Sequence, residues 1–260
     1  MTVAIALIAG AGWGTGLTLG LSMTALQASI GALNDVADAA TDALGRPSKP
    51  IPAGVVTPRS ALALALIAAF VGLGFASLRG PTIAALGVVI LVIGYAYDLG
   101  FKATRWSWLP FAVGIPLLPV FAWFGAADGL PAAFAILIPA AISAGAALAL
   151  GNSLVDLDGD ATAGIVTPTQ AWGAARVRAA STTVLALVAL VAVGTAVLGA
   201  LSPLAIATVT LLGVVVVGAG RWEVAPARTV RERAWQVQAA GVGGLAAAWL
   251  GGLAAAGSLR

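Results

Sequence analysis

The stretch that organises this sequence runs from residue 34 to residue 54 and reads NDVADAATDALGRPSKPIPAG. It brings Asp35, Asp38 and Asp42 directly after an N-terminal run without a charged residue. On a helix with 3.6 residues per turn, these three positions share one face. Three carboxylates on one face repel each other unless a cation lies among them, and Mg²⁺ takes such oxygen ligands. The stretch therefore predicts either a solvated helix end or a magnesium site.

The composition is typical of a polytopic membrane protein. The 260 residues are 60% hydrophobic and 9% charged, whereas soluble domains average about 25% charged residues. We expect an all-α fold, with residues 1–260 forming a single transmembrane domain. Apolar runs close to the length of about 20 residues that crosses a membrane predict nine helices, at residues 2–12, 14–33, 60–78, 81–97, 107–126, 131–153, 177–199, 202–219 and 234–256.

The first of these runs is too short to cross a membrane. Residues 2–33 form one uncharged run, and four glycines around Trp13 predict a turn within it. Either the first helix is short, or the given start omits its beginning, and we favour the missing beginning.

The residue types that are absent limit the chemistry. The chain contains no cysteine and no histidine, which excludes thiolate nucleophiles, histidine bases and zinc sites built on either residue. The net charge is only +3, and the basic residues stand between apolar runs. Membrane topology explains them better than nucleic acid does, so we expect no nucleic-acid partner.

The charged residues predict an orientation. Eleven of the 13 Lys and Arg residues fall on the side that carries residues 34–59. By the positive-inside rule this side is cytoplasmic, so we expect a protein of the cytoplasmic membrane whose active site faces the cytoplasm. The charged segment 221–233 on the same side is interpreted as a solvated connector.

A second acidic stretch covers residues 152–173 and reads NSLVDLDGDATAGIVTPTQAWG. Asp156 and Asp160 share a helical face at a spacing of four residues, whereas Asp158 points elsewhere. Acidic residues next to apolar spans are costly and indicate function. Two such clusters on one side of the membrane predict a pair of Mg²⁺ sites that hold a diphosphate between them.

A diphosphate also needs fixed cations, and three basic residues are candidates. Arg46 and Lys49 follow the first cluster, and Lys102 follows an apolar run in YAYDLGFKATRW. The alternative for Arg46 and Lys49 is membrane topology alone. The alternative for Lys102 is a surface pair with Asp98, four residues earlier.

These motifs resemble those of a known family. NDxxDxxxD followed by GRPSKPIPAG, DLDGD followed by GIVTPTQAWG, and YDLGFK are similar to motifs of the UbiA superfamily of intramembrane prenyltransferases. The sequence departs from the family pattern at Trp172, where Leu is common, and at Asp158, where Glu is frequent. Its short first helix also lacks the basic residue often found there.

The resemblance implies about nine transmembrane helices around a central cavity and Mg²⁺-dependent transfer of an isoprenyl chain from a prenyl diphosphate to a lipophilic acceptor. The implied partners are these two substrates and membrane lipid. The implied catalytic residues are Asp35, Asp38, Asp42, Asp156 and Asp160. The same five residues and Asn34 are the implied metal ligands. The implied substrate-binding residues are Asn34, Arg46, Lys49 and Lys102.

Three other functions fit parts of the pattern. A membrane terpene cyclase of the same family would share every motif. A cation-coupled transporter would place acidic residues in mid-span, whereas here they gather at one face. A CDP-alcohol phosphotransferase would carry a DGxxAR motif, which the sequence lacks.

Overall fold

The computed structural model describes residues 1–259, except for the side chains of residues 162 and 163. Every regular element in this part of the chain is a helix. Seven helical segments are long and apolar enough to cross a membrane. They are α2 (Trp13–Ala37), α4 (Pro58–Ser77), α5 (Pro81–Ala96) with the π-helical η1 (Tyr97–Phe101), α7 (Phe134–Val155), α10 (Ala174–Leu198), α11 (Pro203–Ala219) with η2 (Gly220–Trp222), and α12 (Arg228–Ala255).

Five further helices are shorter. They are α1 (Thr2–Ile8), α3 (Ala39–Gly45), α6 (Trp108–Phe124), α8 (Leu157–Ala163) and α9 (Pro168–Trp172). The predicted all-α polytopic fold is confirmed, and the count of nine spans is approximate. Eight of the predicted spans correspond to the seven long segments and the 17-residue apolar helix α6, and the ninth corresponds to α1, which has only 7 residues.

Local sequence signals set several helix boundaries. Gly10 has φ 90°, and the chain turns there between α1 and α2, as the glycines predict. At the start of α4, the side chain of Thr57 accepts a hydrogen bond from the backbone N–H of Ser60, and Pro58 follows at the first helical position. Ser202 and Pro203 begin α11 in the same way.

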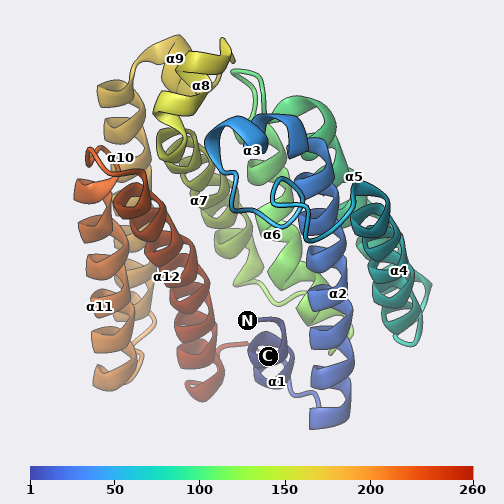
Figure 1. Ribbon diagram of the computed structural model, residues 1–260. Helices are drawn as coiled ribbons and strands as arrows, with labels where there is room; N and C mark the ends of the chain where they lie inside the picture. The colour runs from blue at the N-terminus through green and yellow to red at the C-terminus, as the bar shows by residue number, and fades with distance from the viewer. Residues whose placement is uncertain (260) are drawn as a thin grey trace.

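The same succession of elements occurs twice along the chain. The long helix α2 is followed by the short α3 and then by α4, α5 with η1, and α6. The long helix α7 is likewise followed by the short α8 and α9 and then by α10, α11 with η2, and α12. Figure 1 shows that α2 and α7 run in the same direction and that α3 and α8 lie at the same end of the bundle. The fold therefore has two similar halves, preceded by α1.

Small residues let the helices approach closely. A Cβ atom added at Gly145 of α7 would overlap the backbone carbonyl of Phe111 in α6. At Gly72 of α4, a Cβ atom would lie 2.8 Å from the side chain of Leu26 in α2. Close helix contacts through small residues are the usual way that transmembrane helices associate.

The interpretation of residues 221–233 as a solvated connector is wrong. The helix α12 begins at Arg228, and the side chains of Glu223 and Arg231 are almost fully buried. Burial raises the pKa of Glu223 to about 7, although a hydrogen bond from Ser181 opposes the shift. Only part of the segment is exposed, including Arg221, whose guanidinium lies over the ring of Trp222.

Candidate functional site

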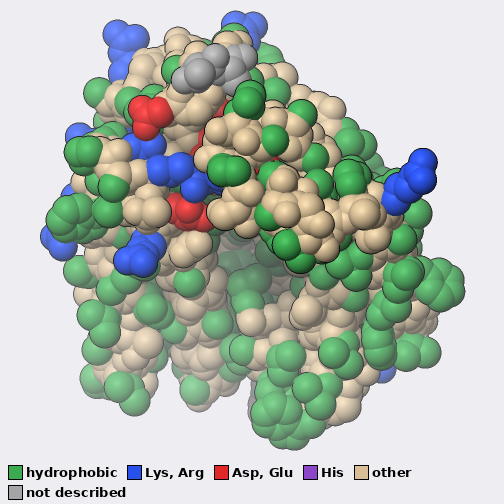
Figure 2. Space-filling model, viewed as in Figure 1, with side chains coloured by type: hydrophobic (Ala, Val, Ile, Leu, Met, Phe, Trp, Pro, Cys, Tyr) green, Lys and Arg blue, Asp and Glu red, His purple; other side chains and the backbone are tan. Residues whose placement is uncertain are grey.

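Both acidic clusters lie at the same end of the bundle. The first belongs to the end of α2 and to α3, and the second belongs to the end of α7 and to α8. On the face seen in Figure 2, acidic side chains gather in the upper half beside Lys and Arg, and the surface is hollowed between apolar side chains below them. The structure thus brings the two sequence stretches to one polar end above an apolar interior.

Each cluster is built on a break in a long helix. The helix α2 ends at Ala37, and Asp38 has φ −88° and ψ −3° before α3 begins. The helix α7 ends at Val155, and Asp156 has φ −101° and ψ 19° before α8 begins. Both aspartates therefore lie near the sparsely populated bridge region, where many active-site residues occur. The predicted continuous helical face through the first three aspartates is wrong, because α3 turns away from α2 after this break.

Two basic residues pair with Asp35 and Asp42 of the first cluster. The ammonium group of Lys49 lies 2.8 Å from the carboxylates of both Asp35 and Asp42. The Nε of Arg46 lies 3.0 Å from the other oxygen of Asp42, which is only 2% exposed. Burial lowers the pKa of Lys49, but hydrogen bonds and Coulomb attraction from both carboxylates outweigh it and raise the pKa. Lys49 is therefore held as a cation between Asp35 of α2 and Asp42 of α3.

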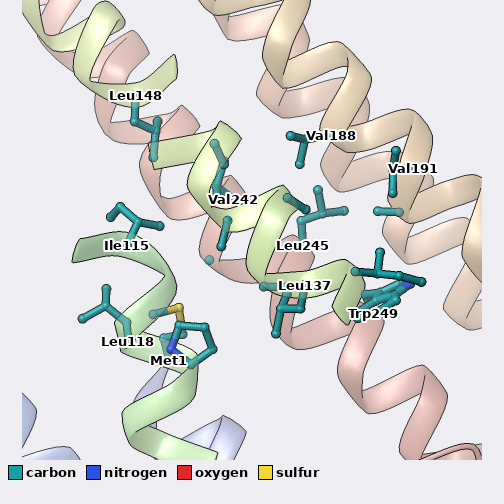
Figure 3. Close-up of a pocket in the computed structure, with 18 of the residues that line it drawn as sticks. Met1, Ile115, Leu118, Leu137, Leu148, Val188, Val191, Val242, Leu245 and Trp249 are labelled. Carbon is teal, nitrogen blue, oxygen red and sulfur yellow. The ribbon is translucent and has the colours of Figure 1, made fainter. Parts of the chain in front are cut away.

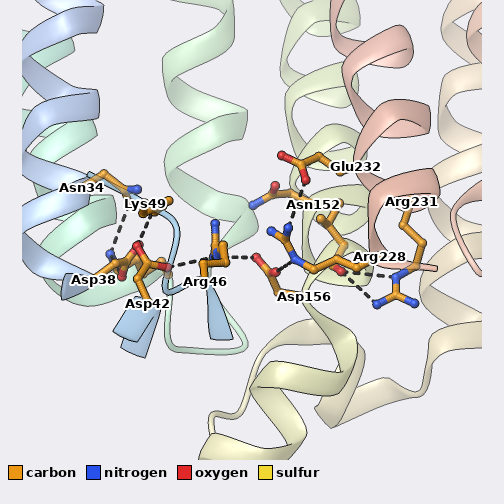
Figure 4. A network of polar contacts seen from close by, with 12 residues as sticks. Asn34, Asp38, Asp42, Arg46, Lys49, Asn152, Asp156, Arg228, Arg231 and Glu232 are labelled. Carbon is orange, nitrogen blue, oxygen red and sulfur yellow. Dashed lines mark hydrogen bonds and ion pairs between the residues drawn. The ribbon is translucent and has the colours of Figure 1, made fainter. Parts of the chain in front are cut away.

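Arg46 also joins the two clusters. Its Nη2 lies 3.2 Å from Asp156, which follows α7. On the other side of Asp156, the Nε of Arg228 lies at 2.6 Å, and Arg228 also pairs with Glu232 at 3.0 Å. Figure 4 shows this row of contacts running from the first cluster through Arg46 and Asp156 to α12. Asp156 is thus held between two guanidinium groups from opposite halves of the protein.

Lys102 contacts the first cluster. Its ammonium group forms an ion pair with Asp38 and donates a hydrogen bond to the side-chain oxygen of Asn34 at 3.2 Å. The alternative pair with Asp98 is not among the ion pairs of the described residues. Lys102 follows directly after η1, and such π-helical turns often mark functional sites.

Asn152 is a site residue that the sequence interpretation did not single out. Its side-chain amide donates a hydrogen bond to the hydroxyl of Tyr97 in η1 at 3.3 Å. Asn152 precedes Asp156 by four residues, just as Asn34 precedes Asp38. This repeated N-x-x-x-D pattern is a signal that identifies Asn152 from sequence. Arg228 had no comparable signal, because basic residues beside a span also serve membrane topology.

The remaining acidic residues of the second cluster differ in their surroundings. Burial, together with the neighbouring charge of Asp156, raises the pKa of Asp160 to about 6, although the nearby Thr167 and the charge of Arg46 oppose the shift. Asp158 points toward α12, where it pairs with Arg231 at 2.8 Å. Because Arg231 also donates to the backbone carbonyl of Val155, this contact holds the start of α12 against the end of α7.

The side chains gathered at this site are of the types that bind Mg²⁺ and phosphate. The acidic residues offer only carboxylate oxygens, and Asn34 offers an amide oxygen, which are the ligands that Mg²⁺ prefers. Within the described part of the chain, no three carboxylates converge closely enough to hold a metal ion. Instead, Lys49 and Lys102 pair with aspartates of the first cluster and Arg46 joins the two clusters, and Lys and Arg also bind phosphate oxygens. The arrangement is close to charge balance, with five aspartates and the four cations Arg46, Lys49, Lys102 and Arg228.

Sequence comparison identifies the family. The model of the UbiA prenyltransferase family matches residues 1–242. The chain belongs to the UbiA prenyltransferase family. This result confirms the predicted family, and it agrees with the helical membrane fold. The protein is therefore an integral membrane protein.

Individual UbiA relatives support the same assignment. The digeranylgeranylglyceryl phosphate synthase of Methanopyrus kandleri is 36% identical over 172 residues, which are 64% of this chain and 62% of that relative. The chain therefore spans less than two thirds of the length of this curated relative.

Solved structures of UbiA homologues share the fold. The apo structure of a homologue from Aeropyrum pernix K1 has a TM-score of 0.72 at 18% identity and covers 93% of this chain and 94% of that one. A homologue from Archaeoglobus fulgidus, bound to GPP and Mg²⁺, has a TM-score of 0.68 at 15% identity and covers 95% of this chain and 94% of that one. At these identities the likeness shows the fold alone.

Proposed function

We propose that this UbiA family member transfers an isoprenyl chain from a prenyl diphosphate to a lipophilic acceptor within the membrane, with Mg²⁺ as cofactor. The observation that carries the proposal is the contact of Arg46 with Asp156, which joins the two acidic clusters of different helices into one site. Family membership and the Archaeoglobus fulgidus homologue bound to GPP and Mg²⁺ support the same reaction.

In this proposal the metal ligands are Asn34, Asp35, Asp38, Asp42, Asp156 and Asp160. Mg²⁺, when bound, supplies positive charge that stabilises the departing diphosphate. Arg46, Lys49 and Lys102 lie among these ligands and now contact their carboxylates. When a diphosphate binds, each of these cations can contact its phosphate oxygens instead. Cations that are already in position need little reorganisation as negative charge builds on the leaving group.

The apolar interior has a second task, which is to exclude water from the reactive isoprenyl group. A cavity of about 150 Å³ lies among α6, α7, α10 and α12. Figure 3 shows that the side chains labelled around it are apolar, and Leu148 is the lining residue of α7 that comes nearest to Asp156 along the helix. We assign this cavity to the isoprenyl chain of the donor. The diphosphate then remains at the polar end, which we place on the cytoplasmic side by the distribution of Lys and Arg.

The test replaces one aspartate of each cluster. Asp38→Ala and Asp156→Ala are each expected to abolish turnover and to leave the protein folded, whereas Asp128→Ala, an exposed position in the loop between α6 and α7, serves as the matched control. Turnover is measured with geranylgeranyl diphosphate, Mg²⁺ and a panel of acceptors that includes an aromatic acid and a glycerol phosphate ether. More than a tenth of the wild-type rate in either variant would contradict a shared site. Cyclic hydrocarbon formed without any acceptor would instead favour a terpene cyclase.

A further inference from the structure

A carboxyl group that belongs to neither acidic cluster is buried in the second half of the fold. Glu223, which follows η2, is 1% exposed. Its Oε1 accepts a hydrogen bond from Ser181 of α10 at 3.4 Å, and Ser181 also donates to the carbonyl of Ala147 in α7 at 3.0 Å. Its other oxygen, Oε2, is buried without a hydrogen-bond partner among the described residues. The carboxyl group therefore lacks the partners that a buried anion needs.

Gln238 of α12 has an unpaired oxygen next to this carboxyl group. Its side chain is fully buried, and its amide nitrogen donates to the carbonyl of Val216 in α11 at 3.3 Å. Its amide oxygen has no partner within the described part of the chain. A Cβ atom added at Gly151 of α7 would lie 2.7 Å from Oε1 of Glu223 and 3.5 Å from Oε1 of Gln238, so both side chains reach the space beside this glycine. A proton on the carboxyl group would give a partner to both unpaired oxygens.

The charges around Glu223 do not take the place of this proton. Arg178 of α10 attracts the anion but forms no ion pair with it among the described residues, and Arg221 lies over the neighbouring indole ring instead. The residues of α7 and α12 that reach the carboxyl group, Gly151 and Gln238, are uncharged. Burial raises the pKa of Glu223 to about 7, although the hydrogen bond to Oε1, the nearby Gln238 and the charge of Arg178 oppose the shift.

Glu223 also stands at the start of the connector 223–227, which leads from η2 to α12. At the other end, the guanidinium group of Arg231 donates hydrogen bonds to two carbonyls of the connector and to the last carbonyl of α7. Arg228, the first residue of α12, follows the connector directly and places its Nε 2.6 Å from Asp156. The position of Arg228 therefore depends on a connector that is fastened at both ends.

We propose that Glu223 is a positioning residue for the second acidic cluster: in its protonated form it donates a hydrogen bond to Gln238 and so holds the connector that sets Arg228 against Asp156. Loss of the proton leaves a buried anion beside an acceptor oxygen, which loosens the connector. The inference rests on the proposed function in one respect, because its effect on the site is measured through Asp156 as a ligand of Mg²⁺.

The first experiment tests the proton and needs no metal ion. Glu223→Gln has the shape of the protonated acid and an N–H to donate, but it does not titrate. An acid whose pKa rises from 4.5 to about 7 on folding binds more protons in the folded state, so its contribution to stability falls as the pH rises through this range. The melting temperature of wild-type protein in detergent is therefore expected to fall relative to that of Glu223→Gln, by at least about 3 °C between about pH 5 and about pH 8. Other titrating groups are common to both proteins and cancel.

The second experiment tests the positioning of Arg228 by calorimetric Mg²⁺ binding. Glu223→Ala is expected to bind Mg²⁺ about twofold or more tightly than wild type, because Arg228 is no longer held against Asp156 as a competitor. Combining Glu223→Ala with Arg228→Gln is expected to add nothing to the effect of Arg228→Gln alone, since both changes remove the same contact. Leu250→Ala is the matched control, because Leu250 is a fully buried residue of α12 outside this group. It is expected to lower the melting temperature and to leave Mg²⁺ affinity unchanged.

Three results would overturn the inference. A constant or opposite difference in melting temperature between wild type and Glu223→Gln would show that the carboxyl group holds no proton. Stabilisation of wild type, but not of Glu223→Gln, by Na⁺ or K⁺ would show that a bound cation takes the proton's place. Additive effects of Glu223→Ala and Arg228→Gln on Mg²⁺ binding would show that Glu223 does not position Arg228.

The inference stays testable if Glu223→Ala does not fold. Wild type and Glu223→Gln are then expected to bind Mg²⁺ equally at about pH 6, and wild type is expected to bind it more tightly at about pH 8, where its carboxyl group has lost the proton. Equal affinities at both pH values would overturn the positioning role. Absence of Mg²⁺ binding by wild-type protein would instead contradict the proposed function, and the melting temperatures would still decide whether Glu223 holds a proton.

Discussion

The guanidinium group of Arg46 lies 3.2 Å from the carboxylate of Asp156, across 110 positions of sequence. Arg46 also pairs with Asp42, so one side chain contacts both acidic clusters. Charge-assisted contacts of this kind are stronger than neutral hydrogen bonds. Arg46 therefore couples the two clusters electrostatically, so that a change of charge in one cluster alters the electrostatic potential at the other.

Lys102 is expected to be important for turnover. Lys102→Met removes the cation that contacts Asp38 and Asn34, and loss of such a donor at a developing negative charge commonly lowers the rate by about 10²–10³. Asp98→Asn is the companion variant, since Lys102 pairs with Asp38 and forms no ion pair with Asp98 among the described residues, and the rate of Asp98→Asn is expected to stay close to that of wild type. Turnover at saturating Mg²⁺ and prenyl diphosphate decides between the two interpretations. Near-wild-type rates for both variants would show that Lys102 does not stabilise the departing diphosphate.

Arg228 is expected to compete with Mg²⁺ for Asp156. Its Nε lies 2.6 Å from this carboxylate, so Arg228→Gln removes a cation that metal binding must displace. We expect the half-saturating Mg²⁺ concentration to fall and the turnover at saturating Mg²⁺ to fall as well, because a cation near the diphosphate is lost. Calorimetric Mg²⁺ binding provides a readout that is independent of activity. Arg221→Gln is the control, since Arg221 is exposed, and a higher Mg²⁺ requirement in Arg228→Gln would contradict the competition.

The orientation in the membrane is testable with single cysteines, because the chain has none of its own. Ser48 lies in the loop after α3, and Asp128 lies in the loop between α6 and α7, and both are exposed. The positive-inside rule predicts that an impermeant thiol reagent labels Cys at position 128 in intact cells and labels Cys at position 48 only after the cells are opened. The reverse pattern would show that the active site faces away from the cytoplasm.

The contact between α6 and α7 is expected to depend on Gly145. Gly145→Ala places a methyl group against the carbonyl of Phe111, so the two helices must separate. Overpacking of this kind costs about 1–3 kcal/mol, and the melting temperature in detergent should fall. Gly74→Ala in α4 is the control, because its added methyl meets no atom within 4 Å. There the stability is expected to stay the same or to rise slightly. Equal melting temperatures for both variants would contradict close packing at Gly145.

Much of the fold was predictable from the sequence, because apolar runs and short polar loops report directly on helices that cross a membrane. The location of both acidic clusters on one side followed from the same runs. The breaks at Asp38 and Asp156 were not predictable from helical spacing, since that spacing assumes an uninterrupted helix. The role of α12 was missed for a different reason. Arg228 meets Asp156 across 72 positions, and no local pattern encodes a pairing over that distance.

The two similar halves of the fold have a consequence for how the site originated. Each half ends its first long helix in N-x-x-x-D and supplies a cation after its third membrane segment, and that cation neutralises the aspartate of its own half, as Lys102 does for Asp38 and Arg228 does for Asp156. This is the arrangement expected of a duplicated gene whose two copies fused. A donor with one diphosphate and one chain has no such symmetry. Arg46 lies eight residues after Asp38, and the matching position eight residues after Asp156 is Gly164, so the cation that joins the two clusters comes from one half alone.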